Sequence, residues 1–348
     1  MPMLLFVLLA AVAEPESYER GKIVERLATM SDPSITYAYY LPSAYDPSAR
    51  WPILYVFDPG KRGPFAAELF RDAAEAYGWI VVSSNDTSSS TDWPPNAKAI
   101  NAMWPDAQRR FSVDTKRIYT AGMSGGAIMA WSLAKISKSV AGVIGCSGRL
   151  ADDHDTDGIA FDWFGTAGID DFNYSETRLI ESKLAAAHAT YRVKIVEGGH
   201  RWPSAAVMRE AVEWMEWQAM RRGARVRDEA FIERMQQREI EAAKADAKRD
   251  PREERRAAEF ESSAKQRTSR AVQQFATNDE ELPATLIQAL DIPRLKKIAT
   301  GSNAQAHAAR RVLELTRFQL RMLARELEQH GRVARAETVR SVAREIEP

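Results

Sequence analysis

Short apolar runs alternate with segments of helical periodicity from residue 35 to residue 222. This alternation is typical of parallel βαβ units, and it constrains the fold more than any other feature of the chain. The predicted strands are 35–41, 53–57, 79–83, 117–121, 140–146, 161–166 and 191–197. The predicted helices are 65–77, 97–110, 125–136, 175–189 and 204–222. We therefore expect an α/β fold with a doubly wound, mostly parallel sheet, whose ligand crevice lies at the carboxyl ends of the strands.

The composition changes near residue 222. All nine Trp and 15 of the 18 Gly precede this point. The chain as a whole has 48 basic and 48 acidic residues, but residues 221–348 carry 27 Lys plus Arg against 21 Asp plus Glu. The two parts therefore have opposite net charge and should attract each other. We expect a lead-in at 14–34, one domain at 35–222 and a charged, all-α C-terminal region at 223–348.

The C-terminal region contains no strand signal. One predicted helix carries an apolar face formed by Val312, Leu315, Phe318 and Met322. A second amphipathic helix follows the turn 329–332, so the two are expected to pack as an antiparallel pair. Residues 324–348 resemble one tetratricopeptide-like helix pair, although a stacked solenoid normally needs three or more repeats. The charge-rich stretch 225–270 is predicted to be a solvated helix or partly disordered.

The N-terminus begins with an apolar run of eleven residues at 3–13, far shorter than the roughly 20 residues that span a bilayer. The run ends in Ala11-Val12-Ala13, a small-residue cleavage pattern, which predicts a signal peptide at 1–13 and an exported, periplasmic or secreted protein. An uncleaved anchor or a misassigned start is the alternative. No later segment predicts a transmembrane helix in the mature chain. The single cysteine, Cys146, excludes an intrachain disulfide.

The sharpest local motif is Gly122-Met123-Ser124-Gly125-Gly126, which lies between the strand 117–121 and the helix 125–136. A G-x-S-x-G sequence in a strand–turn–helix context is typical of a nucleophile elbow, in which a strained turn lifts the Ser hydroxyl clear of the sheet. Ser124 is therefore the candidate nucleophile, and a merely structural turn is the alternative.

A Ser hydroxyl needs a base within hydrogen-bond reach and an acid that orients the base. His200 follows the last predicted strand in Glu197-Gly198-Gly199-His200-Arg201-Trp202-Pro203, where two glycines free the backbone. The other two histidines before residue 222 fit a helix and a solvated loop better. Asp171 is the preferred acid, with Asp170 as the alternative, because both follow the strand 161–166. The chain order is then Ser124, Asp171, His200.

Residues 35–222 resemble an α/β-hydrolase of the esterase and dienelactone-hydrolase-like group, on the GMSGG elbow, the EGGHRWP segment and the order Ser, acid, His. The resemblance implies a serine hydrolase that cleaves esters through an acyl-enzyme. Dienelactone hydrolases use Cys as nucleophile, whereas position 124 is Ser, so lactone opening is not implied. The short connection from Cys146 to Phe161 leaves no room for a large cap domain.

An acyl-transfer site also needs donors for the developing oxyanion. One donor is expected to be the backbone N–H of Gly125. The resemblance places the second at Gly60 or Lys61, although relatives usually carry His-Gly where this chain has Asp-Pro-Gly, and Pro59 has no N–H to donate. Two tryptophans, Trp93 and Trp202, are predicted either to line the substrate pocket or to serve as ordinary packing residues.

These observations favour an exported serine hydrolase that acts on a small-molecule carboxylic ester. The alternatives are a peptidase or amidase of the same fold, and a non-catalytic interaction protein that binds a protein partner through its C-terminal helices. A further alternative is that the tail packs on its own domain. No metal or organic cofactor is implied. Nucleic-acid binding is not expected, because the basic residues of the tail are interleaved with acids.

Overall fold

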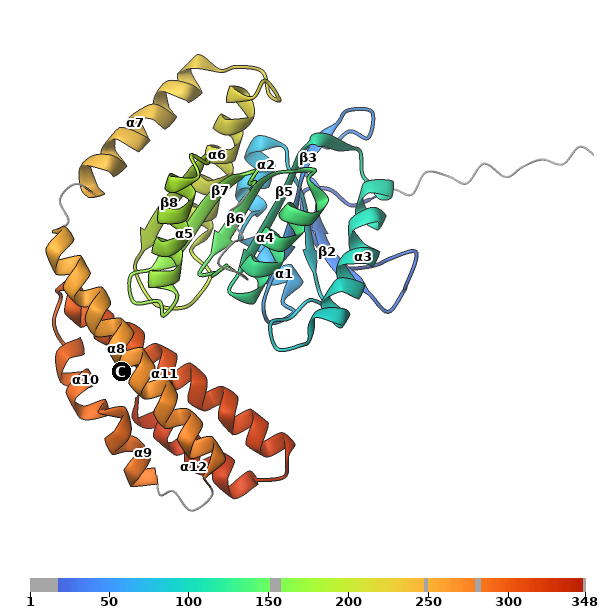
Figure 1. Cartoon of the computed structure of the whole chain (residues 1–348). Coiled ribbons are helices and arrows are strands. Elements are labelled where there is room, and N and C mark those ends of the chain that lie inside the picture. Colours follow the sequence, from blue (N-terminus) through green and yellow to red (C-terminus); the bar gives the residue numbers. More distant parts are fainter. Residues whose placement is uncertain (1–17, 151–157, 247–249, 279–282, 347–348) are drawn as a thin grey trace, which may run out of the picture.

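The computed structural model describes residues 18–150, 158–246, 250–278 and 283–346 (Figure 1). The predicted signal peptide at 1–13 therefore lies outside the described residues. The chain forms an α/β domain followed by a region whose described secondary-structure elements are all helices, which confirms the predicted fold class.

The sheet of the α/β domain has eight strands in the order β1-β2-β4-β3-β5-β6-β7-β8. The strands are β1 (Ile23–Ala28), β2 (Thr36–Tyr40), β3 (Trp51–Phe57), β4 (Ile80–Ser84), β5 (Val113–Met123), β6 (Val140–Cys146), β7 (Asp162–Gly168) and β8 (Tyr191–Val196). β2 pairs antiparallel with β1 and β4, and every other neighbouring pair is parallel. The carboxyl ends of β3 and β5 to β8 therefore meet at one edge of the sheet.

The domain's helices cover both faces of this sheet (Figure 1). They are α1 (Gly63–Glu68), α2 (Arg71–Tyr77), α3 (Trp93–Arg110), α4 (Gly125–Ser137), α5 (Tyr174–Ala186) and α6 (Ala205–Arg221). The segment predicted as one helix at 65–77 is two helices, because the chain turns at 69–70.

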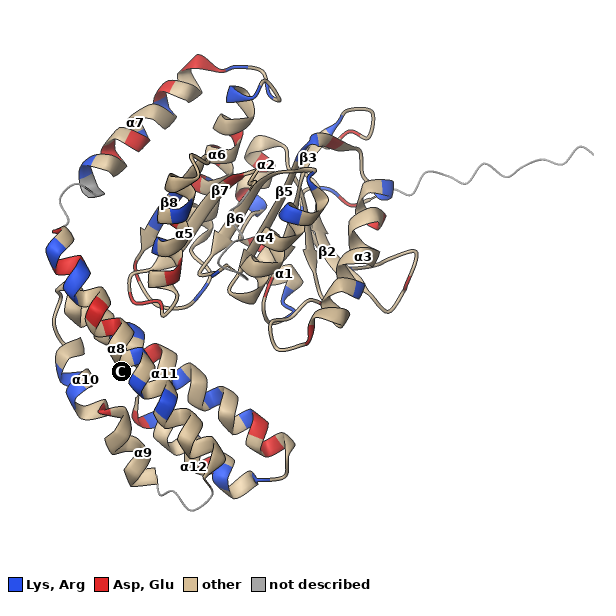
Figure 2. Cartoon of the chain, viewed as in Figure 1, with Lys and Arg blue, Asp and Glu red and all other residues tan. Residues whose placement is uncertain are grey.

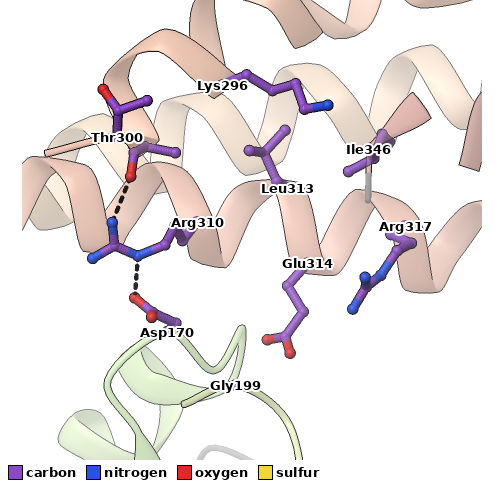
Figure 3. Close-up of a pocket in the computed structure, with 10 residues that line it drawn as sticks. Asp170, Gly199, Lys296, Thr300, Arg310, Leu313, Glu314, Arg317 and Ile346 are labelled. Carbon is purple, nitrogen blue, oxygen red and sulfur yellow. Dashed lines mark hydrogen bonds and ion pairs between the residues drawn. The ribbon is translucent and has the colours of Figure 1, made fainter. Parts of the chain in front are cut away.

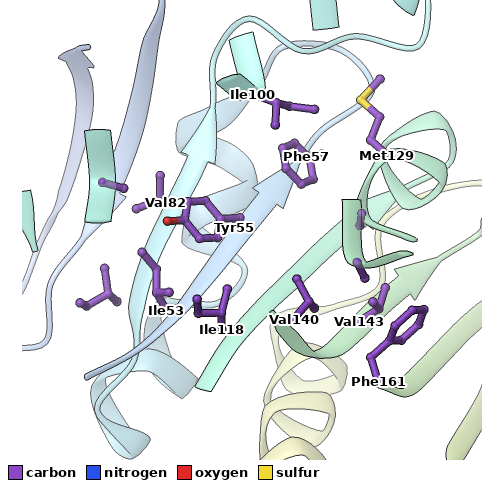
Figure 4. Packing of buried hydrophobic residues seen from close by; sticks show 14 of the residues in the cluster. Ile53, Tyr55, Phe57, Val82, Ile100, Ile118, Met129, Val140, Val143 and Phe161 are labelled. Carbon is purple, nitrogen blue, oxygen red and sulfur yellow. The ribbon is translucent and has the colours of Figure 1, made fainter. Parts of the chain in front are cut away.

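The central strands are buried on both faces, which is why they appear in the sequence as unbroken apolar runs. Alternate residues of β3 belong to different cores. Ile53, Tyr55 and Phe57 pack on one face with Ile118 and other residues shown in Figure 4. Leu54 and Val56 pack on the opposite face, against the side of the sheet covered by α6. The rigid sheet between these two cores holds the loops at its carboxyl edge in fixed positions.

The strand β1 was missed by the sequence analysis, which treated 14–34 as a lead-in. β1 pairs with β2 at the edge of the sheet. Its side chains are half-buried or exposed, and Glu25 and Arg26 interrupt its apolar residues. An edge strand of this kind has no long apolar run, so periodicity could not reveal it.

The C-terminal region is built from α7 (Glu229–Asp246), α8 (Pro251–Thr277), α9 (Pro283–Leu290), α10 (Ile292–Ala299), α11 (Ala304–Gln329) and α12 (Val333–Glu345). Helices α8 to α12 share an apolar core of their own, centred on Phe275, Leu286, Leu320 and Val339. Basic and acidic residues are interspersed along α7, α8 and α11 (Figure 2). The charge-rich stretch 225–270 is thus largely helical in the described residues.

Helices α11 and α12 pack against each other across a short turn, as expected for an antiparallel pair. The predicted apolar face of α11 was wrong at two positions, because Phe318 is 45% exposed and Met322 is 38% exposed. The buried face is instead formed by residues such as Leu313, Leu320 and Leu323. Phe318 is therefore available for contacts outside the helical core.

Candidate active site

Ser124 stands on a sharp turn between β5 and α4, at the carboxyl edge of the sheet. Its backbone has φ 55° and ψ −122°, a strained conformation for a residue with a side chain. A Cβ atom at Gly122 would lie 2.1 Å from the Gly126 carbonyl oxygen, and one at Gly126 would lie 2.0 Å from the Phe57 carbonyl oxygen. Only glycine fits at either position, so the motif's glycines permit the close packing that the turn requires.

His200 links Ser124 to Asp171. Its Nε2 lies 2.9 Å from Ser124 Oγ, and its Nδ1 lies 2.9 Å from Asp171 Oδ1. The Asp171 side chain is fully buried and that of His200 is 12% exposed. An ionised carboxylate can only accept, so Nδ1 donates to Asp171 and Nε2 is left to accept from the serine hydroxyl. The three side chains form one continuous line of hydrogen bonds, which is the arrangement that a nucleophile, a base and an orienting acid require.

The two candidate acids lie in different surroundings. Asp171 Oδ1 contacts His200 and also accepts a hydrogen bond from the Asn173 N–H at 2.8 Å. The carboxylate of Asp170 faces the C-terminal helices, where it meets His307 Nδ1 at 2.7 Å and Arg310 Nε at 2.8 Å. The structure therefore brings Asp171, and not Asp170, to the imidazole.

The predicted oxyanion donors lie in two loops. Gly125 begins α4, where backbone N–H groups have no partner within the helix. The Gly60 N–H already donates to Asp58 Oδ1 at 2.8 Å, so it is engaged within its own loop. Lys61, with a left-handed φ of 62°, therefore remains as the candidate for the second donor.

Asp58 connects the loop after β3 to the histidine loop. Its carboxylate accepts from Trp202 Nε1 at 2.8 Å and from Arg62 Nη2 at 2.9 Å. Burial alone would raise the pKa of Asp58, but hydrogen bonds from Arg62, Trp202 and Gly60 hold it below its usual value. Asp58 therefore remains an ionised acceptor that ties the two loops together.

The two predicted pocket tryptophans differ in burial. Trp202 is only 7% exposed and packs edge-on against Phe70, so it is a packing residue and not an open pocket wall. Trp93 is 50% exposed at the start of α3. The loop before it reaches the elbow, since a Cβ at Gly125 would lie 2.3 Å from Ser89 Cβ.

Residues of α11 reach the site, which the sequence analysis did not foresee. The ring of Phe172 stacks on the His200 imidazole with centroids 4.0 Å apart, and the Phe318 ring lies 5.3 Å from that of Phe172. Glu314 accepts hydrogen bonds from the backbone N–H groups of His200 at 2.6 Å and Phe172 at 3.1 Å. The only sequence signal for this docking was the opposite net charge of the two parts.

A cavity of about 450 Å³ lies where the domain meets the C-terminal helices. Asp170 and Gly199 line it from the domain, and Leu313, Glu314 and Arg317 line it from α11 (Figure 3). Ser124 and His200 are not among its lining residues. The cavity therefore lies on the helical side of the histidine loop and not at Ser124.

Neither a metal cluster nor a membrane-spanning helix is found in the part of the chain that the structure describes. Cys146 ends a buried strand, and burial raises the pKa of its thiol to about 12. Such a thiol is protonated near neutral pH and is a poor nucleophile.

Comparison with known proteins found no matching family model and no matching curated protein. Solved structures do match. A ferulic acid esterase has 17% identity and a TM-score of 0.48, covering 56% of this chain and 97% of that one. The Staphylococcus aureus fluorophosphonate-binding serine hydrolase FphF has 13% identity and a TM-score of 0.47, covering 57% and 99%. A Pyrococcus horikoshii acylaminoacyl peptidase has 10% identity and a TM-score of 0.40, covering 58% and 41%.

Proposed function

We propose that the chain is a serine hydrolase that cleaves carboxylic esters through an acyl-enzyme. The observation that carries the proposal is the continuous hydrogen-bonded arrangement of Ser124, His200 and Asp171, with both links to the imidazole at 2.9 Å. The strained elbow under Ser124 is the second support, because such strain persists only where the surrounding structure enforces it.

In the first half-reaction, Ser124 Oγ attacks the ester carbonyl carbon while His200 Nε2 takes the hydroxyl proton. Asp171 stabilises the resulting imidazolium through Nδ1. The Gly125 N–H and a second donor in the loop after β3 stabilise the oxyanion. The carbon–oxygen bond to the alcohol then breaks, and the imidazolium proton passes to the leaving oxygen.

In the second half-reaction, His200 takes a proton from water as the water attacks the acyl carbon. The bond from that carbon to Ser124 Oγ breaks, and Oγ recovers a proton from the imidazolium. The products are the carboxylic acid and the alcohol. No group outside the three side chains, the backbone donors and water is needed for this balance.

The test is turnover of p-nitrophenyl esters, together with fluorophosphonate labelling, by the purified protein and its Ser124→Ala variant. Ser182→Ala is a matched control, because Ser182 is an exposed serine on α5. We expect Ser124→Ala to lose labelling and at least about 10³-fold in turnover, and Ser182→Ala to keep both.

A folded wild type that neither labels nor turns over any ester would refute the proposal. Peptide anilides included in the same series separate an esterase from a peptidase or amidase, since the same three residues serve both reactions. Faster turnover of the anilides than of the esters would replace the ester assignment while leaving the nucleophile in place.

A further inference from the structure

The loop that carries the catalytic acid is held by the C-terminal helices. In the loop 169–172, the Ile169 carbonyl accepts a hydrogen bond from Arg311 Nη1 at 2.8 Å. The next residue, Asp170, forms an ion pair with Arg310 at 2.8 Å. Both arginines belong to α11. The start of the loop 169–172, which carries Asp171, is therefore fixed by a helix that lies more than a hundred residues later in the chain.

The end of the loop 169–172 is held in the same way. The Phe172 carbonyl accepts from Lys265 Nζ of α8 at 2.6 Å, and the Phe172 N–H donates to Glu314 of α11 at 3.1 Å. Asp171 lies between these anchored residues and directs its carboxylate to His200. The helices thus hold the backbone on both sides of the acid.

Glu314 also reaches the second catalytic loop. One carboxylate oxygen accepts from the Phe172 N–H and the other accepts from the His200 N–H at 2.6 Å. A single side chain of α11 therefore bridges the backbone next to Asp171 and the backbone of the base itself. Hydrogen bonds to a carboxylate are stronger than neutral ones, so this bridge restrains the spacing of the two loops.

Gly199 makes this approach sterically feasible. A Cβ atom at Gly199 would lie 2.1 Å from Glu314 Oε1, so a side chain here would displace the Glu314 carboxylate. Glu314 is half-buried, and burial raises the pKa of its carboxyl. Removing a carboxylate from water costs free energy unless hydrogen bonds compensate. The backbone N–H groups of Phe172 and His200 provide these hydrogen bonds to Glu314. Figure 3 shows Glu314 pointing from its helix toward the loop that carries Gly199.

We propose that Glu314 is a positioning residue of the active site, which holds the loops of Asp171 and His200 in the register needed for proton transfer to and from Ser124. This inference rests on the proposed function. It makes α11 a part of the active site and not a separate module. Glu314 acts through the backbone and touches no reacting atom, so it is not itself catalytic.

The test compares Glu314→Ala and Glu314→Gln with the control Glu326→Ala in the full chain. Glu326 is an exposed glutamate on the same helix, and no hydrogen bond or ion pair to its side chain is found among the described residues. We expect Glu314→Ala to lower kcat by about 10- to 100-fold, because small displacements of catalytic groups have effects of this size. KM should stay within about threefold, since substrate contacts are unchanged.

Glu314→Gln keeps one acceptor, which can still bind the His200 N–H, so it should recover part of the lost kcat. The rate of fluorophosphonate labelling should follow kcat through the series, because both depend on the same base. Glu326→Ala should behave like the wild type. A role limited to holding the helices on the domain would instead lower thermal stability without this split between kcat and KM.

The inference is overturned if folded Glu314→Ala keeps kcat within twofold of the wild type, or if Glu326→Ala loses as much. Where Glu314→Ala fails to fold, Glu314→Gln decides: a threefold or larger loss of kcat at constant KM supports the inference, and full activity refutes it. A wild type without esterase activity or labelling refutes the proposed function and this inference together. An active wild type with unaffected Glu314 variants refutes this inference alone.

Discussion

Replacement of Arg311 by methionine should destabilise the C-terminal helices, because its ion pair with Glu261 joins α11 to α8. The Arg311 side chain is 5% exposed and that of its partner Glu261 is 1% exposed, with Nη2 and Oε2 2.6 Å apart. Removing one member of a buried ion pair costs about 3–5 kcal/mol, because the other charge stays buried. Glu261 retains Lys265 at 2.6 Å and Ser175 at 2.9 Å, which favours the lower end of that range.

The loss should be about 3 kcal/mol, and two probes can localise it. All nine tryptophans precede residue 222, so tryptophan fluorescence follows the α/β domain, whereas far-ultraviolet circular dichroism follows both parts. We expect the circular dichroism signal of Arg311→Met to be lost at a lower urea concentration than that of the wild type. In the variant this loss should precede the change in tryptophan fluorescence. The double variant Arg311→Met/Glu261→Met should recover part of the loss, because both buried charges of the pair are removed, although Lys265 loses its ion pair with Glu261. A change of less than about 1 kcal/mol in the single variant would contradict the reasoning.

Three further outcomes are expected. Phe318→Ala should raise KM for aromatic esters more than for acetate esters, because its exposed ring, 5.3 Å from that of Phe172 and 6.4 Å from that of His200, offers an apolar wall; equal KM changes would exclude that wall. The folded pKa of Asp58 is lowered, so its contribution to stability is present above the unfolded pKa and is lost as pH falls through the folded pKa. The free energy of unfolding, measured in urea between pH 2 and pH 6, about the range in which carboxyl groups titrate, should therefore fall less steeply with falling pH for Asp58→Asn than for the wild type. Parallel curves for the two proteins would argue against this contribution. N-terminal sequencing of exported protein should begin at Glu14, and a retained Met1 would contradict the predicted signal peptide.

The sheet, and the proximity of Ser124, Asp171 and His200 to one another, could be predicted from the sequence because both depend on local signals. A parallel strand buried on both faces is a continuous apolar run, so β3 and β6 were located closely. The elbow is likewise local, since its glycines flank Ser124 directly. Parallel strands end at one edge of the sheet, so residues that follow β7 and β8 could be expected near that serine.

The contribution of α11 could not be predicted, because it depends on docking between distant segments. Phe318 fitted the apolar periodicity of a helix and was assigned to the helical core, although its ring lies beside Phe172. Glu314 appeared as one of many charges in a charged region. Trp202 stands next to His200 in the histidine loop but packs inward, because Asp58 accepts its indole N–H. The side-chain direction was decided by a partner 144 residues away.

The hydrogen bond from His200 to Glu314 joins residues 114 positions apart, and it also sets an order of events during biosynthesis. A chain emerges from a ribosome or a membrane channel with its N-terminus first, so the elbow and the histidine are outside long before α11. If Glu314 positions the base, an incomplete chain has its nucleophile exposed but not yet activated. Hydrolysis at the full rate would then begin when the last helices arrive, and a chain that has lost them would hydrolyse esters slowly even with Ser124, Asp171 and His200 all present.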